Sequence, residues 1–589
     1  MIIGPAFYRE VTVAPRQPKL FIFRSLYGGV ILLLICTAWL VVTGTQLVRD
    51  TGDFARFGGL LFQLLAPLQL VILLFSSAIL AAGAVAQEKD RKTLVLLLLT
   101  RMTNAELVFG KLLASLLSVL ILLLTSLPLF MVMTLLGGIS YAQVIRVLVV
   151  TLWSLFVCGS LGSCMALWRD KTFQALAATI LIIVAWLGFW EAVHFGYFGK
   201  TWGMLSTNQL AMAMSPWQAI QLAAQPTFTA ASGLFWSISG FLTVFTLLGI
   251  LINGIAILMV RVWNPSRETR LTSMEEDTWR KEEKSSRLPQ PVHVISAASG
   301  KVRHVWNNPI AWREICTHAY GRKTLVLRFA YILLFFCAAW MIHSTVHSNA
   351  EWTLSQFAAP YLPLLILSLI LVNAQAVTSL TSERDGGTFV LLLASDISPK
   401  EFVYGKLGGT FYNMKEMFVL PLALSFYFWW ANVISLTNAC FLMSGLLVLY
   451  FFVAMTGIYI GMQYENTRSA IATSLGLIFF LFIGIATCMW IMVGFSGSFE
   501  VQLQSFLAFM IGGSIGIYIA IGARNPSAAI GLASFILPIA TFYSITSMLL
   551  GQYHFVFIAA AATYGFTTVA MLIPAVDEFD VATGRTTAD

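Results

Sequence analysis

The sequence predicts an all-α polytopic membrane protein built from two parallel repeats, and three observations support this prediction. The chain has 589 residues, of which 58% are hydrophobic and only 11% charged, whereas a soluble domain carries about 25% charged residues. Apolar runs long enough to cross a bilayer recur along the whole chain, and one charged segment between two runs occurs twice. So few charges cannot cover an aqueous surface. This excludes a soluble enzyme and a nucleic-acid binder, despite the net charge of +8.

The apolar runs set the number of expected membrane spans. A bilayer core of about 30 Å requires about 20 apolar residues per helix. Fourteen runs meet this length, six in the first repeat and eight in the second, so we expect about six spans in the first repeat and six to eight in the second. They cover residues 23–44, 60–86, 108–136, 143–168, 173–195, 234–260, 325–345, 358–381, 402–431, 437–462, 469–494, 501–523, 527–549 and 553–575. We therefore divide the chain into a first repeat (1–260), a charged linker (261–308), a second repeat (309–576) and a tail (577–589).

Lysine and arginine predict the orientation, because cytoplasmic loops are enriched in both. With the N-terminus in the cytoplasm, 31 of the 35 basic residues fall on the cytoplasmic side, and only Arg49, Arg56, Arg146 and Lys200 fall outside. We expect a multi-pass protein of the cell (plasma or inner) membrane with both termini and the linker in the cytoplasm. The mixed charges of the linker are typical of a solvated connector, and a regulatory or lipid-contacting role stays open.

The two halves contain an internal duplication. Their sequences align at a constant shift, so that position 88 corresponds to position 383 and position 112 to position 407. We call this shift the repeat offset. Between 88–112 and 383–407, 12 of 25 positions are identical. Both copies begin on the same side of the membrane, so the expected repeats are parallel ones, related by an axis along the membrane normal.

The duplicated segment predicts a short helix at the cytoplasmic face. The apolar stretch Leu94–Leu99 is far too short to cross a bilayer, and it follows a cluster of charges. Thr103 with Glu106, and Ser398 with Glu401, then match the capping box that opens a helix. Capping by itself accounts for these two glutamates, and a contact with a partner protein is the alternative. For Glu88 and Glu383, ordinary interfacial charge is the simple alternative, but the duplication of the whole pattern favours a docking surface.

These residues resemble the permease subunits of type-2 ABC exporters. The resemblance is carried by E-x-(x)n-T-x-x-L-L-L followed by E-x-x-x-G-K-L, and by an opening segment Pro-x-x-(Tyr/Trp)-Arg-Glu, which contains Arg9 and Glu10 and again Arg313 and Glu314. In that family the opening segment is an amphipathic elbow, and the segment after the second span is a coupling helix that docks on a separate ATPase. The resemblance assigns this role to Glu88, Asp90, Thr93, Leu96, Glu383, Asp385, Thr388 and Leu391.

The resemblance also implies which partners the chain has. This chain joins two repeats in one polypeptide, whereas single-repeat permeases dimerise. One chain would therefore pair with two ATPase copies, and whether further transport subunits take part stays open. No G-x-x-x-x-G-K-[ST] phosphate loop occurs in the sequence. We therefore expect no enzyme activity and no cofactor in this chain, with ATP and Mg²⁺ bound by the partner.

Polar residues inside the expected spans are candidates for a transport pathway, because charges in lipid are costly. Lys415 and Glu416 could line such a pathway, or serve a structural role. His343, His347 and Glu351 share one helical face, a spacing that could hold a metal, but without a further ligand we expect interfacial polar residues and no metal. The seven cysteines form no CxxC pair, so we expect neither disulfides nor a zinc site.

Three function classes fit a chain of this kind. An ABC permease, more consistent with export than import, agrees best with the duplicated segment. A secondary transporter or channel driven without ATP would need more intramembrane acids, histidines or broken helices. A membrane-embedded enzyme would need clustered catalytic groups, whereas the seven histidines are scattered. No residue selects the substrate.

Overall fold

The computed structural model describes most of the chain. The described residues are 7–8, 11–12, 18–45, 50–199, 201–202, 205–225, 232–264, 306–316, 324–347, 354–395, 397–494, 499–522, 527–549, 552–577 and 579. Arg9, Glu10, Glu351, nearly all of the linker and most of the tail lie outside these residues, as does the side chain of Leu391.

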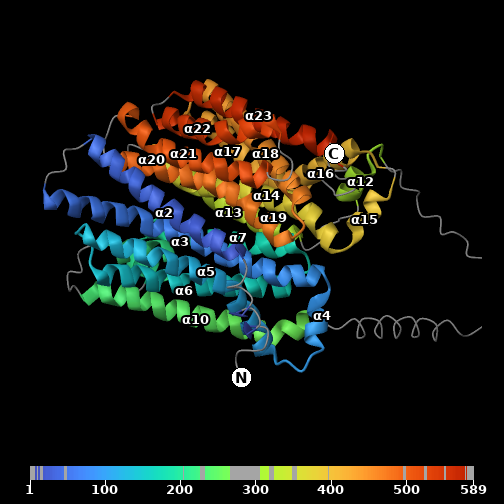
Figure 1. Cartoon of the computed structure of the whole chain (residues 1–589). Helices are drawn as coiled ribbons and strands as arrows, with labels where there is room; N and C mark the ends of the chain where they lie inside the picture. Colours follow the sequence, from blue (N-terminus) through green and yellow to red (C-terminus); the bar gives the residue numbers. More distant parts are fainter. Residues whose placement is uncertain are drawn as a thin grey trace, which may run out of the picture.

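The described residues of the first half (18–264) form a layer of long helices along one side of the molecule (Figure 1). Its elements are α2 (Pro18–Thr45), α3 (Thr51–Asp90), α4 (Thr93–Leu98), α5 (Asn104–Leu135), α6 (Tyr141–Trp168), α7 (Thr172–His194), β1 (Thr201–Trp202), β2 (Leu205–Ser206), α8 (Thr207–Met214), α9 (Pro216–Ala224) and α10 (Ser232–Trp263). The two short strands pair antiparallel.

The second half (306–579) lies along the other side, with its helices roughly parallel to those of the first (Figure 1). Its elements are α12 (Pro309–Cys316), α13 (Thr324–Val346), α14 (Leu354–Asp385), α15 (Thr388–Leu393), α16 (Pro399–Asn413), α17 (Lys415–Trp430), α18 (Leu436–Gln463), α19 (Thr467–Phe479), the π-helical turn η2 (Phe480–Gly484), α20 (Ile485–Gly494), α21 (Phe499–Gly522), α22 (Ala528–Leu549) and α23 (Tyr553–Asp577).

The all-α polytopic class is confirmed. In the part of the chain that the structure describes, twelve helices are long and apolar enough to cross a membrane. Two of the fourteen expected spans differ. The run 501–523 is α21, whose described apolar part is shorter than a full span.

The expected continuous span 402–431 is wrong, because the chain breaks into α16 and α17 at Met414. The break leaves backbone groups without helical partners. The Arg328 guanidinium compensates by donating a hydrogen bond of 2.7 Å to the Asn413 carbonyl oxygen. Such breaks are tolerated in membrane helices when neighbouring groups satisfy the freed backbone.

The extra helices of the second half are α21 and α22. In the first half, α10 packs on α6; in the second half, the last helix, α23, packs on α18 in the same way. The segments in between differ, because α21 and α22 stand where the first half has only the short helices α8 and α9.

Glycines let the paired helices of each half approach closely. A Cβ atom on Gly162 of α6 would lie 2.5 Å from the Ala78 carbonyl oxygen of α3. At the counterpart position, a Cβ atom on Gly457 of α18 would lie 2.9 Å from the Asn373 carbonyl oxygen of α14. Small residues at such positions allow backbones in lipid to pack directly against each other.

Candidate functional site

The two short helices α4 and α15 lie at the same end of the bundle, which we call the α4/α15 end (Figure 1). Each follows a sharp turn that ends a long helix. The turn residue is Lys92 with φ 59° in the first half and Gly387 with φ 73° in the second. A left-handed conformation at these two positions redirects the chain sideways, so a short helix leaves the bundle axis after α3 and again after α14.

Both short helices are anchored by an equivalent ion pair. Lys111 of α5 contacts Glu88 at the end of α3, and Lys406 of α16 contacts Glu383 at the end of α14. The threonine that begins each short helix donates its hydroxyl to the backbone carbonyl of the same glutamate: Thr93 to Glu88 at 3.2 Å, and Thr388 to Glu383 at 3.1 Å.

Two further contacts connect each junction to the next helices. Lys89 donates to the carbonyl oxygens of Leu167 and Arg169 at the end of α6, and Arg384 donates to those of Met462 and Tyr464 at the end of α18. Asp90 accepts the Thr172 hydroxyl at the start of α7, and Asp385 accepts the Thr467 hydroxyl at the start of α19. Every one of these pairs recurs at the repeat offset.

The helices that follow begin with the predicted caps. Thr103 and Glu106 form a capping box at the start of α5, and Ser398 and Glu401 form one at the start of α16. The hydrogen bonds donated by the Ser398 backbone N–H and hydroxyl lower the pKa of Glu401. Capping therefore accounts for both glutamates.

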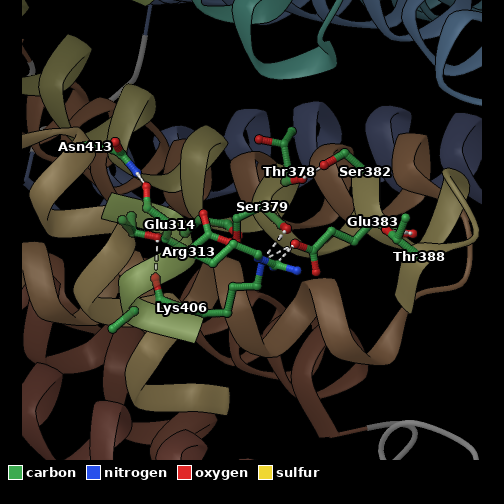
Figure 2. Close-up of polar contacts among 12 residues, drawn as sticks. Arg313, Glu314, Thr378, Ser379, Ser382, Glu383, Thr388, Lys406 and Asn413 are labelled. Carbon is green, nitrogen blue, oxygen red and sulfur yellow. Dashed lines mark hydrogen bonds and ion pairs between the residues drawn. The ribbon is translucent and has the colours of Figure 1, made fainter. Parts of the chain in front are cut away.

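A buried ionic cluster joins the helix α12 to the second junction. The Lys406 ammonium lies 2.7 Å from carboxylate oxygens of both Glu314 and Glu383, and it also donates to the Ser379 carbonyl oxygen at 3.0 Å (Figure 2). Arg313 contacts both glutamates as well. Two carboxylates and two cations are thus brought together, which is the arrangement that makes buried charges tolerable. The cluster therefore ties α12 to the turn before α15.

The sequence-predicted coupling residues divide into two groups. Glu88 and Asp90 are engaged inside the bundle, and Thr93 bonds its own turn. Leu96 instead is 64% exposed, and Leu99 just beyond α4 is 67% exposed. The outward face of α4 is therefore apolar, and the polar residues position it.

Sequence reasoning missed the lysines and one arginine that hold these helices. In the sequence, Lys111 and Lys406 belong to a repeated Gly-Lys-Leu motif, but nothing there indicated which residues they contact. Arg261, in the last turn of α10, bonds Asn104 at 2.7 Å and donates to the carbonyl oxygens of Leu98 and Met102. It therefore fixes the loop between α4 and α5, which no sequence signal indicated.

The remaining candidates lie away from the junctions. Lys415 is exposed and lies over the Tyr412 ring, whereas Glu416 pairs with Arg328 at 3.3 Å. The His343 Nδ1 atom lies 2.8 Å from the Tyr427 hydroxyl, and the His343 and His347 rings are 4.1 Å apart. Within the described residues, no group of three or more His, Cys, Asp or Glu side chains is arranged to hold a metal ion.

Comparison with known families identifies the first half. Residues 30–262 match the family described as ABC-2 family transporter protein. The matched segment runs from α2 to the end of α10, so it contains the whole first junction with Glu88, α4 and Lys111. No curated protein and no solved structure gives a significant match to the chain. Residues 30–262 of this multi-pass membrane protein therefore belong to the ABC-2 transporter family and form a type-2 ABC permease domain.

Proposed function

We propose that this chain is the membrane-spanning subunit of an ABC exporter, with the α4/α15 end in the cytoplasm and two ATPase copies docked on α4 and α15. One observation carries the proposal: two short helices of equal length at the same end are held by the same ion pair and hydrogen bonds, at the repeat offset. Because α4 and α15 present similar surfaces, two copies of the same partner could bind them. The excess of basic residues predicted for this side supports its cytoplasmic location.

The contacts of α4 explain how a partner would move the bundle. Its junction is bonded to α5 through Lys111, to α6 through Lys89 and to α7 through Asp90. A force on α4 therefore reaches α3, which directly precedes it, together with α5, α6 and α7. ATP and Mg²⁺ would bind the partner, since the phosphate-loop motif is absent from this sequence. The second half would act as a second permease repeat, because its junction is built from the corresponding residues.

The test changes the exposed apolar face and leaves the anchoring residues intact. Leu96→Glu introduces a charge on the outward face of α4, whereas Glu88→Ala would also break the pair with Lys111. Tyr141→Glu is the matched control, because Tyr141 is 61% exposed and begins α6 at the opposite end. The full chain is purified in mild detergent from its own host's membranes, and the co-purified ABC ATPase is quantified together with its ATP hydrolysis.

We expect Leu96→Glu to lower the bound ATPase by about 10-fold or more, because burying a leucine contributes roughly 1.5–3 kcal/mol. Tyr141→Glu should retain wild-type binding. Unchanged ATPase binding in Leu96→Glu would refute docking at α4. Transport that continues after the ATPase is removed would instead favour a carrier driven by an ion gradient.

A further inference from the structure

The two halves meet along several helix pairs, among them α2 with α21 and α7 with α13. Two of these interfaces are related by the repeat offset. In one, α3 of the first half packs against α19 of the second. In the other, α14 of the second half packs against α7 of the first. Because α14 corresponds to α3 and α19 to α7, every residue in one interface has a counterpart in the other. The two can therefore be compared position by position.

Side-chain bonds close the α3–α19 interface at the α4/α15 end. Arg468 donates to the Ala84 carbonyl oxygen at 3.1 Å. Arg91, just after α3, bonds Asn466 just before α19 at 3.4 Å, and it also pairs at 3.2 Å with Asp385 at the end of α14. Farther along, the rings of Phe75 and Phe479 lie 5.6 Å apart. Separating α3 from α19 would break the charge-assisted hydrogen bond of Arg468, which is of the stronger kind.

The corresponding place in the α7–α14 interface holds a small polar cavity. The counterpart of Arg468 is Phe173, and the counterpart of Ala84 is Ser379. Between the start of α7 and α14, a cavity of about 70 Å³ is lined by Lys171, Thr172 and Phe173, by Glu314 of α12, and by three hydroxyl residues of α14 and Glu383. The three hydroxyl residues are Thr378, Ser379 and Ser382. A cavity this polar and this large can hold water.

Gln375 adds an unsatisfied amide on the same face of α14. It lies three and four residues before Thr378 and Ser379, a spacing that places all three side chains on one helical face. Gln375 is fully buried, and neither its amide nitrogen nor its amide oxygen has a hydrogen-bond partner among the described residues. Its counterpart in the first half is Leu80. A buried amide without a partner carries its full desolvation penalty, so Gln375 destabilises the closed packing on this face of α14.

We propose that the two halves separate along the α7–α14 interface while the α3–α19 interface stays closed, and that Gln375 and the α14 hydroxyls receive hydroxyl or amide groups of the transported molecule. The ligand class follows from the neutral groups. The Gln375 amide can both donate and accept, whereas the three hydroxyls already donate to carbonyl oxygens of α14 and can accept. The two carboxylates of the lining, Glu314 and Glu383, are already paired with Lys406 and Arg313. The transport part of this inference rests on the proposed function, but the opening itself can be measured without any ATPase.

The test compares one matched pair of cysteines. In a full-length chain with its seven native cysteines replaced, Ser379→Cys and Ala84→Cys are each labelled in membrane vesicles with a small, charged thiol reagent applied to the α4/α15 end. We expect Ser379→Cys to react at least about 10-fold faster, because water reaches only that interface. Complete labelling of both after denaturation verifies that each thiol is intact. Equal rates, or a faster Ala84→Cys, would overturn the proposal even if ATPase docking holds.

The role of Gln375 is tested in the same assay. Gln375→Leu, which copies Leu80, should slow the labelling of Ser379→Cys several-fold by stabilising the closed interface. It should leave the labelling of Ala84→Cys unchanged. Gln375→Asn keeps the amide and should keep the faster rate. An unchanged rate in Gln375→Leu would show that this amide does not control the opening.

Discussion

The ammonium group of Lys406 lies 2.7 Å from a carboxylate oxygen of Glu383, and the lysine side chain is fully buried. Its counterpart in the first half, the pair of Lys111 and Glu88, keeps 15% and 19% of its side chains exposed. One repeated contact thus exists in two environments. In the second half, α12 also contributes Glu314 to Lys406.

Removing Lys406 should therefore cost more than removing Lys111. Lys406→Met would leave Glu314 and Glu383 without their shared ammonium, and breaking a buried pair in this way costs about 3–5 kcal/mol. Lys111→Met should cost less, because water can still reach Glu88. Thermal unfolding of both purified variants measures the difference. A smaller loss for Lys406→Met than for Lys111→Met would contradict the buried cluster.

Lys92→Gly should stabilise the protein. Lys92 has φ 59°, a conformation that costs a residue with a side chain roughly 1–2 kcal/mol, whereas its counterpart Gly387 adopts φ 73° freely. We expect the unfolding midpoint to rise for Lys92→Gly and to fall for Gly387→Ala. Midpoints that move in the opposite directions would show that the left-handed turn is not required at these positions.

Alanine at Gly162 should force α3 and α6 apart. The new Cβ atom would stand 2.5 Å from the Ala78 carbonyl oxygen, and overpacking of this kind costs about 1–3 kcal/mol. Gly476→Ala is the control, because no atom lies within 4 Å of a Cβ atom at that helical position. Thermal stability should fall for Gly162→Ala and hold or rise for Gly476→Ala. Equal stability of the two variants would argue against the close helix contact.

Arg91→Ala should have a small, salt-dependent effect. The Arg91 side chain is 45% exposed, so its pair with Asp385 contributes no more than about 1 kcal/mol. We expect the difference in unfolding midpoint from wild type to shrink as salt rises toward about 1 M, where the screening length is about 3 Å. A difference that persists undiminished at high salt would assign the effect of Arg91 to packing.

Local chemistry explains why much of this protein was predictable. Long apolar runs leave only the helix as a way to satisfy the backbone in lipid, so the all-α class followed from composition. The capping boxes at Thr103 and Ser398 depend on residues three positions apart, which a sequence displays directly. The repeated segment likewise predicted that α4 and α15 would have the same form.

The tertiary structure decided everything that depends on distant partners. Arg328 compensates for the break at Met414 from 85 residues away, and Arg91 reaches Asp385 across 294 residues. The amide of Gln375 is costly only because folding buries it beside helices far away in sequence. The sequence by itself determined which segments are helices and which are duplicated, because those properties are local. Which counterpart becomes buried, paired or left unsatisfied was decided by packing between the halves, because the burial of a polar group is a property of its three-dimensional neighbours.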